Sequence, residues 1–301
     1  MISALVCTRG RPRDIVVAVR SLLASPEAAL ELLVIDQSDD AQTERALGEL
    51  AADTRLRYIR SQTRGKGAAL NEGLRLARGP VVVCTDDDCE AEPGWLGAMT
   101  RVFEEQPTAA VAFCKVIAPP HDVAAGYVPT YEQPRRVLRS VVDLCAGRGL
   151  GAGMALRRDV ALELGGFDES LGPGARFLAA EDMDFAVRAL LRGWHVYDTG
   201  DRPILHHGFR SFSQGREHAR RDFIGLGAAC AKPLLAKRWK AMVLPAWEFS
   251  AHAVWPPVSD LLRLRRPRGL ARVSGFLQGF SEALRTPVNR ETVMFVKQPK
   301  P

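Results

Sequence analysis

The sequence predicts an α/β fold: a Rossmann-like, mixed but mostly parallel sheet flanked by helices, with a helical C-terminal extension. Short β-like runs alternate with helical patterns through the first third of the chain, which is typical of a parallel sheet covered by helices on both faces. Polar side chains directly follow three of these runs, and such sheets bind ligands at the carboxyl ends of their strands. After Phe212 the pattern becomes helical. The sequence therefore predicts a binding edge in its first half and helices at its end.

Four buried strands are expected in the first third of the chain. Each is a short apolar run bounded by polar or glycine-containing segments. The segments between them carry apolar residues at helical spacing, and the third such helix stops at Gly79 and Pro80. The expected strands are residues 2–7, 31–36, 56–61 and 81–88, and the expected helices are residues 15–25, 38–53 and 65–77.

The alternation continues before the chain becomes helical. The pattern predicts a helix over residues 95–106, a strand over 109–119, a strand leading into a helix over 154–167, a helix over 181–194 and a strand over 195–199. Because proline removes a backbone donor and clashes with the preceding turn, five prolines should divide the C-terminal helical part. They are Pro245, Pro256, Pro257, Pro267 and Pro287.

The net charge of +6 is unevenly distributed. From Lys237 onward there are 12 Lys/Arg and 4 Asp/Glu, a surplus of +8, so the first 236 residues carry 29 against 31, or −2. A nucleic-acid reader would carry its basic residues on the folded domain, interleaved with aromatic side chains, so no nucleic-acid partner is expected. The basic extension also contains Trp239, Trp247 and Trp255, which favours peripheral contact with an anionic membrane surface. An ordinary solvated helix pair that packs on the body is the alternative.

The sequence indicates neither secretion nor a membrane span. The apolar segment at its start is about six residues long and precedes basic residues, the wrong order for a secretory signal. No uncharged apolar run reaches the ~18 residues that cross a bilayer. The six cysteines form no CxxC pair and are interpreted as reduced thiols. We therefore expect a cytoplasmic protein, with the inner face of the membrane as the place of any peripheral contact.

Three adjacent carboxylates, Asp86, Asp87 and Asp88, end the fourth expected strand. Because like charges repel at this spacing, a bound cation would stabilise them, and hard cations such as Mg²⁺ or Mn²⁺ take oxygen ligands. Such an ion completes its coordination shell with water and substrate phosphates. The alternative is a turn whose acids are solvated.

Two further residues at this edge could hold a nucleotide. Asp36 ends the second strand, where a carboxylate can accept a hydrogen bond from a ribose hydroxyl or a base N–H. In the same segment, Asp39 or Asp40 would cap the following helix. Lys66 lies at a glycine-rich helix start and could approach a phosphate, although the segment lacks the P-loop spacing.

Acidic and imidazole side chains recur in the second half. Glu181 and Asp182 open an expected helix, so they supply either a general base for an attacking hydroxyl or a favourable charge at the helix N-terminus. His206 and His207 follow an expected strand. A single histidine is more often structural, but beside carboxylates and phosphates an imidazole could complete a metal shell.

Taken in order, these motifs resemble those of the family-2 inverting glycosyltransferases, members of the nucleotide-diphospho-sugar transferase superfamily with the GT-A fold. The resemblance covers roughly residues 2–221, and the order of the series is more specific than any one motif. The series is "CTRGRP", "VIDQSDD", "RGKGAALNEGL", "TDDDCEAEPGWL", "GAGMALRRDVALELGGFDE", "AEDMDFAVRALLRGW" and "HHG".

The resemblance implies a role for each candidate residue. Asp182 of the "ED" pair matches the base that deprotonates the acceptor, with Glu181 beside it. The implied nucleotide-binding residues are Thr8, Arg9, Arg11, Asp36, Lys66, Asn71, Asp86 and Asp87. The implied metal ligands are Asp88 and Asp86, together with His206 or His207.

The implied activity is metal-dependent, inverting transfer of a single sugar from a nucleoside-diphosphate sugar (UDP-, GDP- or dTDP-linked) to an acceptor hydroxyl. The acceptor would be a glycan, a lipid-linked molecule or a small molecule, and the cofactor Mg²⁺ or Mn²⁺. Residues 1–95 would form the nucleotide-binding half, residues 96–236 the acceptor and catalytic half, and residues 237–301 the basic extension. A polysaccharide synthase is not favoured, because a QxxRW motif and membrane spans are not found.

Two other functions stay open. A sugar-phosphate nucleotidyltransferase shares the α/β architecture and acidic metal sites, but its usual "GxGxRxxPxT" start is missing. A catalytically inactive nucleotide-sugar-binding protein is the other, and the presence of Asp86, Asp88 and Asp182 argues against it. A homodimer is compatible with any of these functions.

Overall fold

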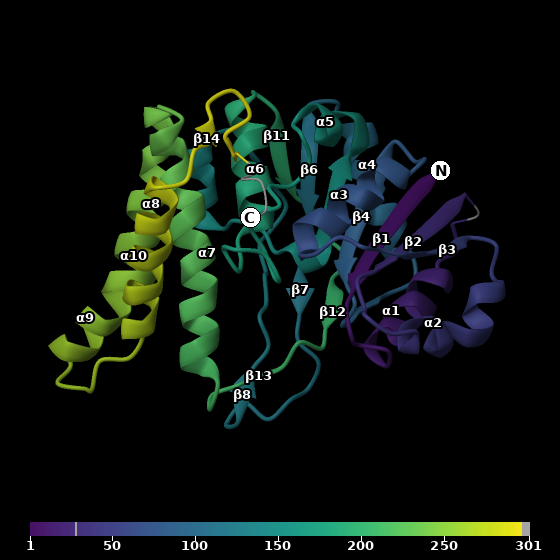
Figure 1. Ribbon diagram of the computed structural model, residues 1–301, viewed down its shortest axis with the longest axis horizontal. Coiled ribbons are helices and arrows are strands. Elements are labelled where there is room, and N and C mark those ends of the chain that lie inside the picture. The colour runs from purple at the N-terminus through teal and green to yellow at the C-terminus, as the bar shows by residue number, and fades with distance from the viewer. Residues whose placement is uncertain (28, 297–301) are drawn as a thin grey trace.

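The computed structural model describes residues 1–27 and 29–296 and contains an eight-stranded mixed sheet (Figure 1). Its strands are β1 (Ile2–Thr8), β2 (Leu30–Asp36), β3 (Leu56–Arg60), β4 (Val81–Asp86), β6 (Ala109–Phe113), β9 (Arg136–Leu138), β10 (Met154–Arg157) and β11 (His195–Asp198). Their order is β3-β2-β1-β4-β10-β6-β11-β9. The first four in this order are parallel, whereas β10 is antiparallel to both of its neighbours and β9 is antiparallel to β11. The expected α/β class and the four N-terminal strands are confirmed.

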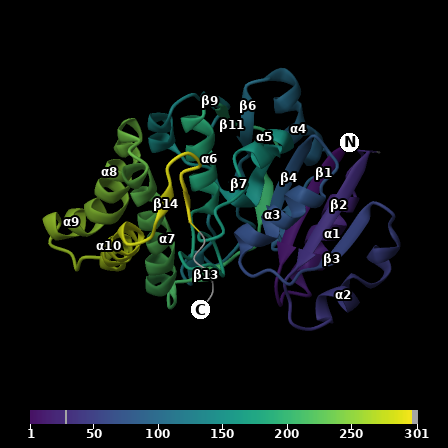
Figure 2. The same ribbon diagram turned by 45° about the horizontal axis from the view of Figure 1, so that its top comes forward.

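Helices cover both faces of the sheet (Figure 2). Alternate residues of β1 enter different cores: Leu5 packs in the same cluster as Leu70, and Val6 in the same cluster as Ile15. This two-sided burial explains why the strands are apolar throughout rather than alternating. The helices of the sheet region are α1 (Asp14–Leu23), α2 (Gln42–Leu47), η1 (Gly48–Ala52), α3 (Lys66–Leu76), α4 (Trp95–Glu105), α5 (Arg158–Glu163) and α6 (Glu181–Leu191).

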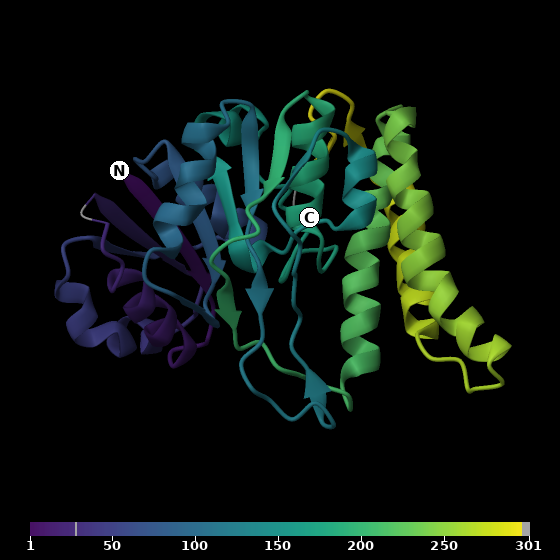
Figure 3. The same cartoon turned by 180° about the vertical axis from the view of Figure 1, so that it is seen from behind.

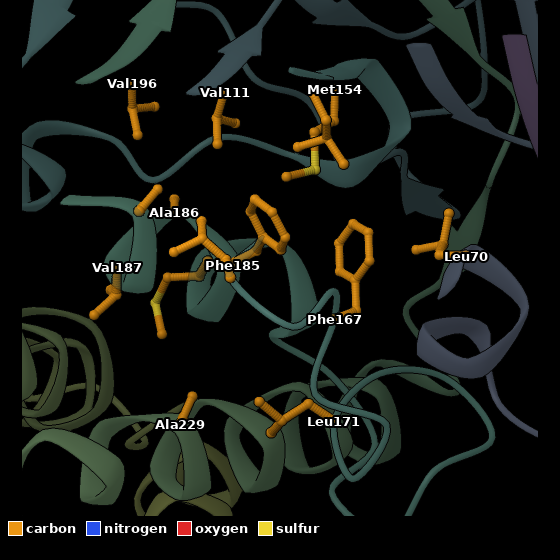
Figure 4. Packing of buried hydrophobic residues seen from close by; sticks show 14 of the residues in the cluster. Leu70, Val111, Met154, Phe167, Leu171, Phe185, Ala186, Val187, Val196 and Ala229 are labelled. Carbon is orange, nitrogen blue, oxygen red and sulfur yellow. The ribbon is translucent and has the colours of Figure 1, made fainter. Parts of the chain in front are cut away.

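The larger core lies between the sheet and α6 (Figure 4). Phe167 and Phe185 are both fully buried there, and their ring centroids are 4.9 Å apart. Phe185 comes from the second turn of α6, so this packing fixes the helix that begins with Glu181 and Asp182. The core thereby positions a candidate catalytic pair.

The register of the parallel strands brings the expected polar residues to one edge of the sheet. Thr8 of β1 is opposite Asp36 of β2, and Cys7 is opposite Asp86 of β4. Four short elements continue this edge toward the second half of the chain. They are β5 (Cys89–Ala91), β7 (Val116–Ile117) and β12 (Ile204–His206), which form a three-stranded sheet, and η3 (Gly151–Gly153).

The C-terminal part is helical, as expected, and lies at the opposite end of the molecule from β3 (Figures 1 and 2). Among the described residues, no helix is long and apolar enough to span a membrane. The helical elements are α7 (Gly215–Leu235), η4 (Trp239–Met242), α8 (Val243–Trp247), η5 (Glu248–Val254), α9 (Trp255–Leu262) and α10 (Leu270–Leu284). The remaining elements are η2 (Val141–Ala146) and two antiparallel strand pairs, β8 (Gly126–Tyr127) with β13 (Arg210–Ser211) and β14 (Val288–Asn289) with β15 (Met294–Phe295).

The prolines divide this region less than expected. Helical structure is continuous from residue 239 to 262, through Pro245, Pro256 and Pro257, with η5 wound as a π-helix. Pro256 and Pro257 fall in the first turn of α9, where a missing N–H is tolerated. Pro267 and Pro287 do lie between elements, so the expectation is wrong only for the first three.

Candidate active site

A cleft of about 500 Å³ opens beside the carboxyl end of β4. Lys66 and Asp86 line it on the side of the parallel strands, and Glu181 and Asp182 line it where α6 begins. Its lining also includes Glu248 and His252 of the π-helical segment η5, from the C-terminal extension. This volume is typical of a small-molecule site. The cleft therefore joins residues from all three parts of the chain.

A hydroxyl group at the end of β1 and a guanidinium from the loop after β1 bind the two carboxylates that follow β4. Thr8 Oγ1 donates to Asp87 Oδ2 at 2.6 Å, and Arg11 Nη1 donates to Asp87 Oδ1 and Asp88 Oδ2, each at 2.9 Å. Burial raises the pKa of Asp87 to about 6, despite the nearby Arg11 guanidinium. Asp87 thus points back toward β1 rather than into the cleft, and it fixes the loop that presents its two neighbours.

Asp88 and His206 form the candidate metal site. Asp88 Oδ1 is the one buried side-chain oxygen or nitrogen without a hydrogen-bond partner in the part of the chain that the structure describes. His206 Nε2 lies 3.5 Å from it, which is long for a hydrogen bond, while His206 Nδ1 is 3.1 Å from the Pro129 carbonyl. Burial raises the pKa of Asp88, but His206 and Arg11 outweigh burial and lower that pKa to about 2. The ionised carboxylate and the oriented imidazole fit a divalent cation such as Mn²⁺ or Mg²⁺.

A thiol lies near this pair. Possible ligand atoms of Asp88, Cys89 and His206 all fall within 4.8 Å of one another. Burial raises the pKa of the Cys89 thiol well above its ordinary value, and a metal-ligating cysteine must be a thiolate. The oxygen and nitrogen donors of Asp88 and His206 therefore fit a hard cation better than Cys89 does.

Two of the expected metal ligands have other neighbours. His207 lies with its Nε2 3.3 Å from Glu90 Oε2, on the exposed side of β12. Asp86 accepts a short hydrogen bond from Lys66 Nζ. The structure therefore brings the imidazole of His206, but not that of His207, to the Asp88 carboxylate, and it pairs Asp86 with a cation from α3.

Glu181 and Asp182 are sequence neighbours in different environments. Asp182 Oδ2 accepts the Gly151 N–H at 2.7 Å, and Oδ1 accepts the Met183 N–H at 2.7 Å. Glu181 is only 5% exposed, with Oε1 3.5 Å from Lys66 Nζ. Burial raises the pKa of Glu181 to about 7. Burial also lowers the pKa of the Lys66 ammonium, but Asp86 and Glu181 outweigh burial, and the net pKa is raised.

The remaining expected nucleotide-binding residues lie outside the lining of the cleft. Asp36 is fully buried and accepts hydrogen bonds from the Ser38 N–H and the Tyr58 hydroxyl, each at 2.8 Å. Arg9 is exposed, with Nη2 3.3 Å from Asp39 Oδ2. Asn71 donates to the Phe167 carbonyl at 2.9 Å and accepts its N–H at 2.7 Å. Asn71 therefore connects α3 to the segment before α6.

Sequence reasoning missed several residues of the cleft. Ala180, the residue before Glu181, has a φ of +72°, in the left-handed region that non-glycine residues rarely adopt. Glu248 is 2% exposed and forms an ion pair with Arg148 inside the cleft lining. No local pattern marks either feature.

Solved structures of sugar-nucleotide complexes share the fold. A mannosyltransferase from Pyrobaculum calidifontis, in complex with GDP-Man and Mn²⁺, superposes with a TM-score of 0.64 and 20% identity, covering 94% of this chain and 86% of that one. S. aureus TarS 1-349 in complex with UDP-GlcNAc gives a TM-score of 0.65 and 16% identity over 94% of this chain and 80% of that one. At this identity the likeness shows the GT-A fold alone.

Sequence relatives are glycosyltransferases. The glucosyl-dolichyl phosphate glucuronosyltransferase of Haloferax volcanii is 27% identical over 215 residues, which are 67% of this chain and 66% of that protein. The beta-monoglucosyldiacylglycerol synthase of Trichormus variabilis is 25% identical over 65% of this chain but only 42% of its own length. The chain thus spans between two fifths and two thirds of these relatives.

A family model extends over more than half of the chain. The model described as glycosyl transferase family 2 matches residues 3–165 of 301. The matched range includes Thr8, Asp36, Lys66 and the three carboxylates Asp86, Asp87 and Asp88 at the end of β4 and directly after it. The chain therefore belongs to glycosyl transferase family 2, and it is a glycosyltransferase with a GT-A fold.

Proposed function

We propose that this glycosyltransferase moves a single sugar from a nucleoside-diphosphate sugar to an acceptor hydroxyl, with inversion and with the help of a divalent cation. One observation carries the proposal: a single cleft is lined by Lys66 and Asp86 at one side and by the carboxylate of Asp182 where α6 begins. The ammonium of Lys66, which could contact phosphates, and a candidate base thus face the same space.

The donor would lie against the carboxyl ends of the parallel strands. Lys66 begins α3, so its ammonium and the helix N-terminus both favour a phosphate. Its present partners, Asp86 and Glu181, keep the ammonium charged and in place. Complexes of GT-A neighbours with the nucleotide sugars GDP-Man and UDP-GlcNAc, and with the nucleoside diphosphate UDP, support this class of donor.

Asp88 and His206 would hold the cation. When bound, a divalent ion at this position would offset the negative charge that develops on the departing nucleoside diphosphate. Arg11 would keep one oxygen of Asp88 fixed, so that the other, Oδ1, is free for the ion.

Asp182 would act as the general base. The N–H groups of Gly151 and Met183 orient its carboxylate at the cleft wall, where it could accept the proton of an attacking hydroxyl. Direct attack by that hydroxyl displaces the diphosphate from the opposite face of the anomeric carbon and inverts its configuration in one step. Glu181 lies behind this group, against Lys66.

We place the acceptor toward the C-terminal extension. The names of two relatives, a glucosyl-dolichyl phosphate glucuronosyltransferase and a beta-monoglucosyldiacylglycerol synthase, specify lipid chemistry. Together with the basic residues after Lys237, they support a lipid-linked or lipid acceptor and a protein that works at the cytoplasmic face of a membrane, in contact with it through residues 237–301.

The test separates donor binding from turnover. A panel of UDP-, GDP- and dTDP-sugars is screened with Mn²⁺ and Mg²⁺, using the unfolding temperature for binding and release of nucleoside diphosphate for turnover. Donor at a hundredfold excess over its dissociation constant should stabilise the fold by about 2.7 kcal/mol. Asp88→Ala and His206→Ala should remove the metal-dependent part of this stabilisation. Asp182→Asn should retain it but reduce turnover by roughly 10²-fold or more.

His207→Ala is the matched control, because it removes an imidazole that contacts Glu90 and keeps the backbone N–H that donates to the Asp88 carbonyl. Equal loss of donor binding in the Asp88 and Asp182 variants would contradict the assigned roles. Donor binding without release of diphosphate under any condition would point to an inactive sugar-nucleotide-binding protein.

A further inference from the structure

The free end of α9 carries several exposed apolar side chains. Leu262 is 72% exposed and Leu264 is 97% exposed, and Leu261 and Trp255 are also exposed. Leu264 has a φ of +55°, a conformation that costs a non-glycine residue about 1–2 kcal/mol. We call residues 255–270 the α9 tip. Large apolar side chains held outward in this way mark a binding surface rather than a folding core.

The α9 tip is also strongly basic. Arg263, Arg265, Arg266 and Arg268 follow its leucines, and Asp260 is the sole acidic residue between positions 255 and 281. Asp260 is buried and neutralised by Arg268, whose Nη2 donates to Oδ1 at 3.0 Å and whose backbone N–H donates to Oδ2 at 2.9 Å. The arginines therefore face solvent around a fixed turn with no acidic side chain interspersed.

A second projection comes from the catalytic half of the chain. Where β8 pairs with β13, Val123 is 74% exposed and Phe212 is 57% exposed. The Phe212 ring packs on Tyr127, with centroids 6.0 Å apart, so the projection is braced by its own pairing. We call residues 121–127 and 209–213 the β8–β13 tip.

Both tips reach the same end of the molecule. In Figure 1 the α9 tip and the β8–β13 tip lie at the lower end, and Figure 3 shows the same from behind. The carboxyl ends of β1 and β4 point toward this end as well. The cleft is lined by Arg210 of β13 and by Phe223 and Leu226 of α7, the elements that connect the β8–β13 tip to the C-terminal helices.

We propose that the two tips together dock the protein on an anionic lipid bilayer, at the end of the molecule toward which the carboxyl ends of β1 and β4 point. The leucines and tryptophan of the α9 tip would enter the interfacial region and its arginines would contact lipid phosphates, while Val123 and Phe212 form the second contact. This goes beyond a membrane role for the whole extension, because it assigns the contact to one turn of the extension and to one loop pair of the catalytic half.

Charge decides between a bilayer and a second copy of the chain. In a symmetric dimer through the α9 tip, the arginines of both copies would face each other at close range, with Asp260 already neutralised. An anionic bilayer provides the complementary charge. The docking itself does not depend on the proposed function. Only its purpose does, which is to reach an acceptor that lies in the lipid phase.

The test measures binding to lipid without using activity. The full chain is sedimented with sucrose-loaded vesicles of equal parts phosphatidylglycerol and phosphatidylcholine, and with vesicles of phosphatidylcholine alone. We expect binding to the anionic vesicles that weakens with added salt. Replacing three arginines together (Arg263→Gln, Arg265→Gln, Arg266→Gln) should lower the partition coefficient roughly a hundredfold, since each basic residue near the surface contributes about fivefold to binding.

Apolar variants separate insertion from charge. Leu261→Ser, Leu262→Ser and Leu264→Ser combined should lower partitioning at least roughly tenfold, and Val123→Ser with Phe212→Ser should lower it measurably on its own. Leu76→Ser with Leu162→Ser is the matched control, since both leucines are exposed on α3 and α5, away from the tips. It should bind vesicles like the unmodified chain.

The outcomes are distinct from those of the proposed function. Donor-induced stabilisation should be the same in every tip variant, so its loss would indicate misfolding rather than lost docking. Failure of the unmodified chain to bind anionic vesicles, or equal binding by all variants, overturns the proposal even if sugar transfer is observed. A leucine variant that turns a dimer into a monomer in analytical ultracentrifugation, with vesicle binding unchanged, would assign the α9 tip to a second copy instead.

Discussion

At the level of single residues, the two acids at the start of α6, Glu181 and Asp182, differ in role because their side chains point in different directions. Successive residues of a helix point about 100° apart, so Asp182 can reach the cleft wall while Glu181 packs inward against Lys66. The sequence identifies the pair, but both residues are acids in the first turn of a helix. No feature of the neighbouring sequence predicts which side chain packs against the protein interior. Burial, a tertiary property, makes that distinction.

The buried carboxyl predicts a pH dependence of stability. Because the pKa of Glu181 is raised from 4.5 to about 7 in the fold, the native state binds its proton more tightly than the unfolded chain does. Its contribution to stability is complete below the unfolded pKa and declines as pH rises toward 7. Glu181→Gln removes this decline. The unfolding free energy of the variant minus that of the unmodified chain should therefore increase by up to about 3 kcal/mol between pH 4.5 and pH 8.

Urea unfolding at a series of pH values measures this difference. Glu163→Gln, at an exposed position of α5, is the matched control and should change little across the series. Parallel stability curves for Glu181→Gln and the unmodified chain would mean that Lys66 keeps Glu181 ionised throughout.

The two histidines after β12 show what strand geometry adds to a motif. His206 is the last residue of β12 and is buried, whereas His207 follows it and is exposed. Alternation along a strand predicts that only one of two adjacent residues faces a given site. It does not predict which one, because that depends on the pairing of β12 with β5 and β7.

At the level of elements, α7 and α10 pack with their backbones unusually close. A Cβ added at Gly279 of α10 would lie 1.9 Å from the Ile224 carbonyl oxygen of α7, and one added at Gly227 would lie 2.1 Å from the Phe276 carbonyl oxygen. Glycine costs a helix interior up to about 1 kcal/mol relative to alanine, so its presence here indicates a packing requirement. The C-terminal helices are thus fitted closely to the catalytic half.

We expect Gly279→Ala to destabilise the protein by about 1–3 kcal/mol, because the added methyl group meets backbone that can relax only if the helices separate. Chemical denaturation measures the change, and hydrogen exchange of α10 would show where it acts. Gly215→Ala is the matched control, since a Cβ there meets no atom within 4 Å. A gain in stability from both substitutions would mean that helix propensity, not packing, decides the effect.

Most of the strands and helices could be predicted from the sequence. The parallel strands β1 to β4 follow from apolar runs between glycine- and proline-containing turns, and α3, α4 and α6 from helical spacing. The continuous helical segment through Pro245 and Pro256 could not be predicted. The positions of prolines in a sequence do not reveal whether the missing backbone N–H falls in the first turn of a helix. The insertion of antiparallel β10 between β4 and β6 was also hidden, since strand order depends on contacts distant in sequence.

At the level of the whole molecule, a buried charged cluster connects segments far apart in the chain. Lys232 of α7 is fully buried and donates to Asp168 at 2.6 Å and to Asp184 at 2.5 Å. Arg188 pairs with Asp184 at 2.9 Å, and the backbone N–H of Phe295 donates to Asp168 at 2.8 Å. The sequence shows these as scattered charges, because only the folded arrangement brings them together.

Lys232→Met should destabilise the fold by about 3–5 kcal/mol, because it leaves two buried carboxylates with one cation between them. The unfolding free energy from denaturant titration is the measurement. Lys240→Met, at an exposed position, is the matched control with the same change in charge and length. A cost below about 1 kcal/mol would contradict the burial of this cluster.

The contact between Phe295 and Asp168 also bears on how the chain folds as it is made. Domains generally fold from the N-terminus during synthesis, but here a buried carboxylate near the catalytic helix receives one of its donors from a residue 127 positions later. The Phe295 ring also packs on Phe177, with centroids 5.0 Å apart. A nascent chain that has emerged only as far as α7 therefore cannot yet close its own catalytic half. Final packing around Asp168 must await the emergence of β15, which contains Phe295, from the ribosome.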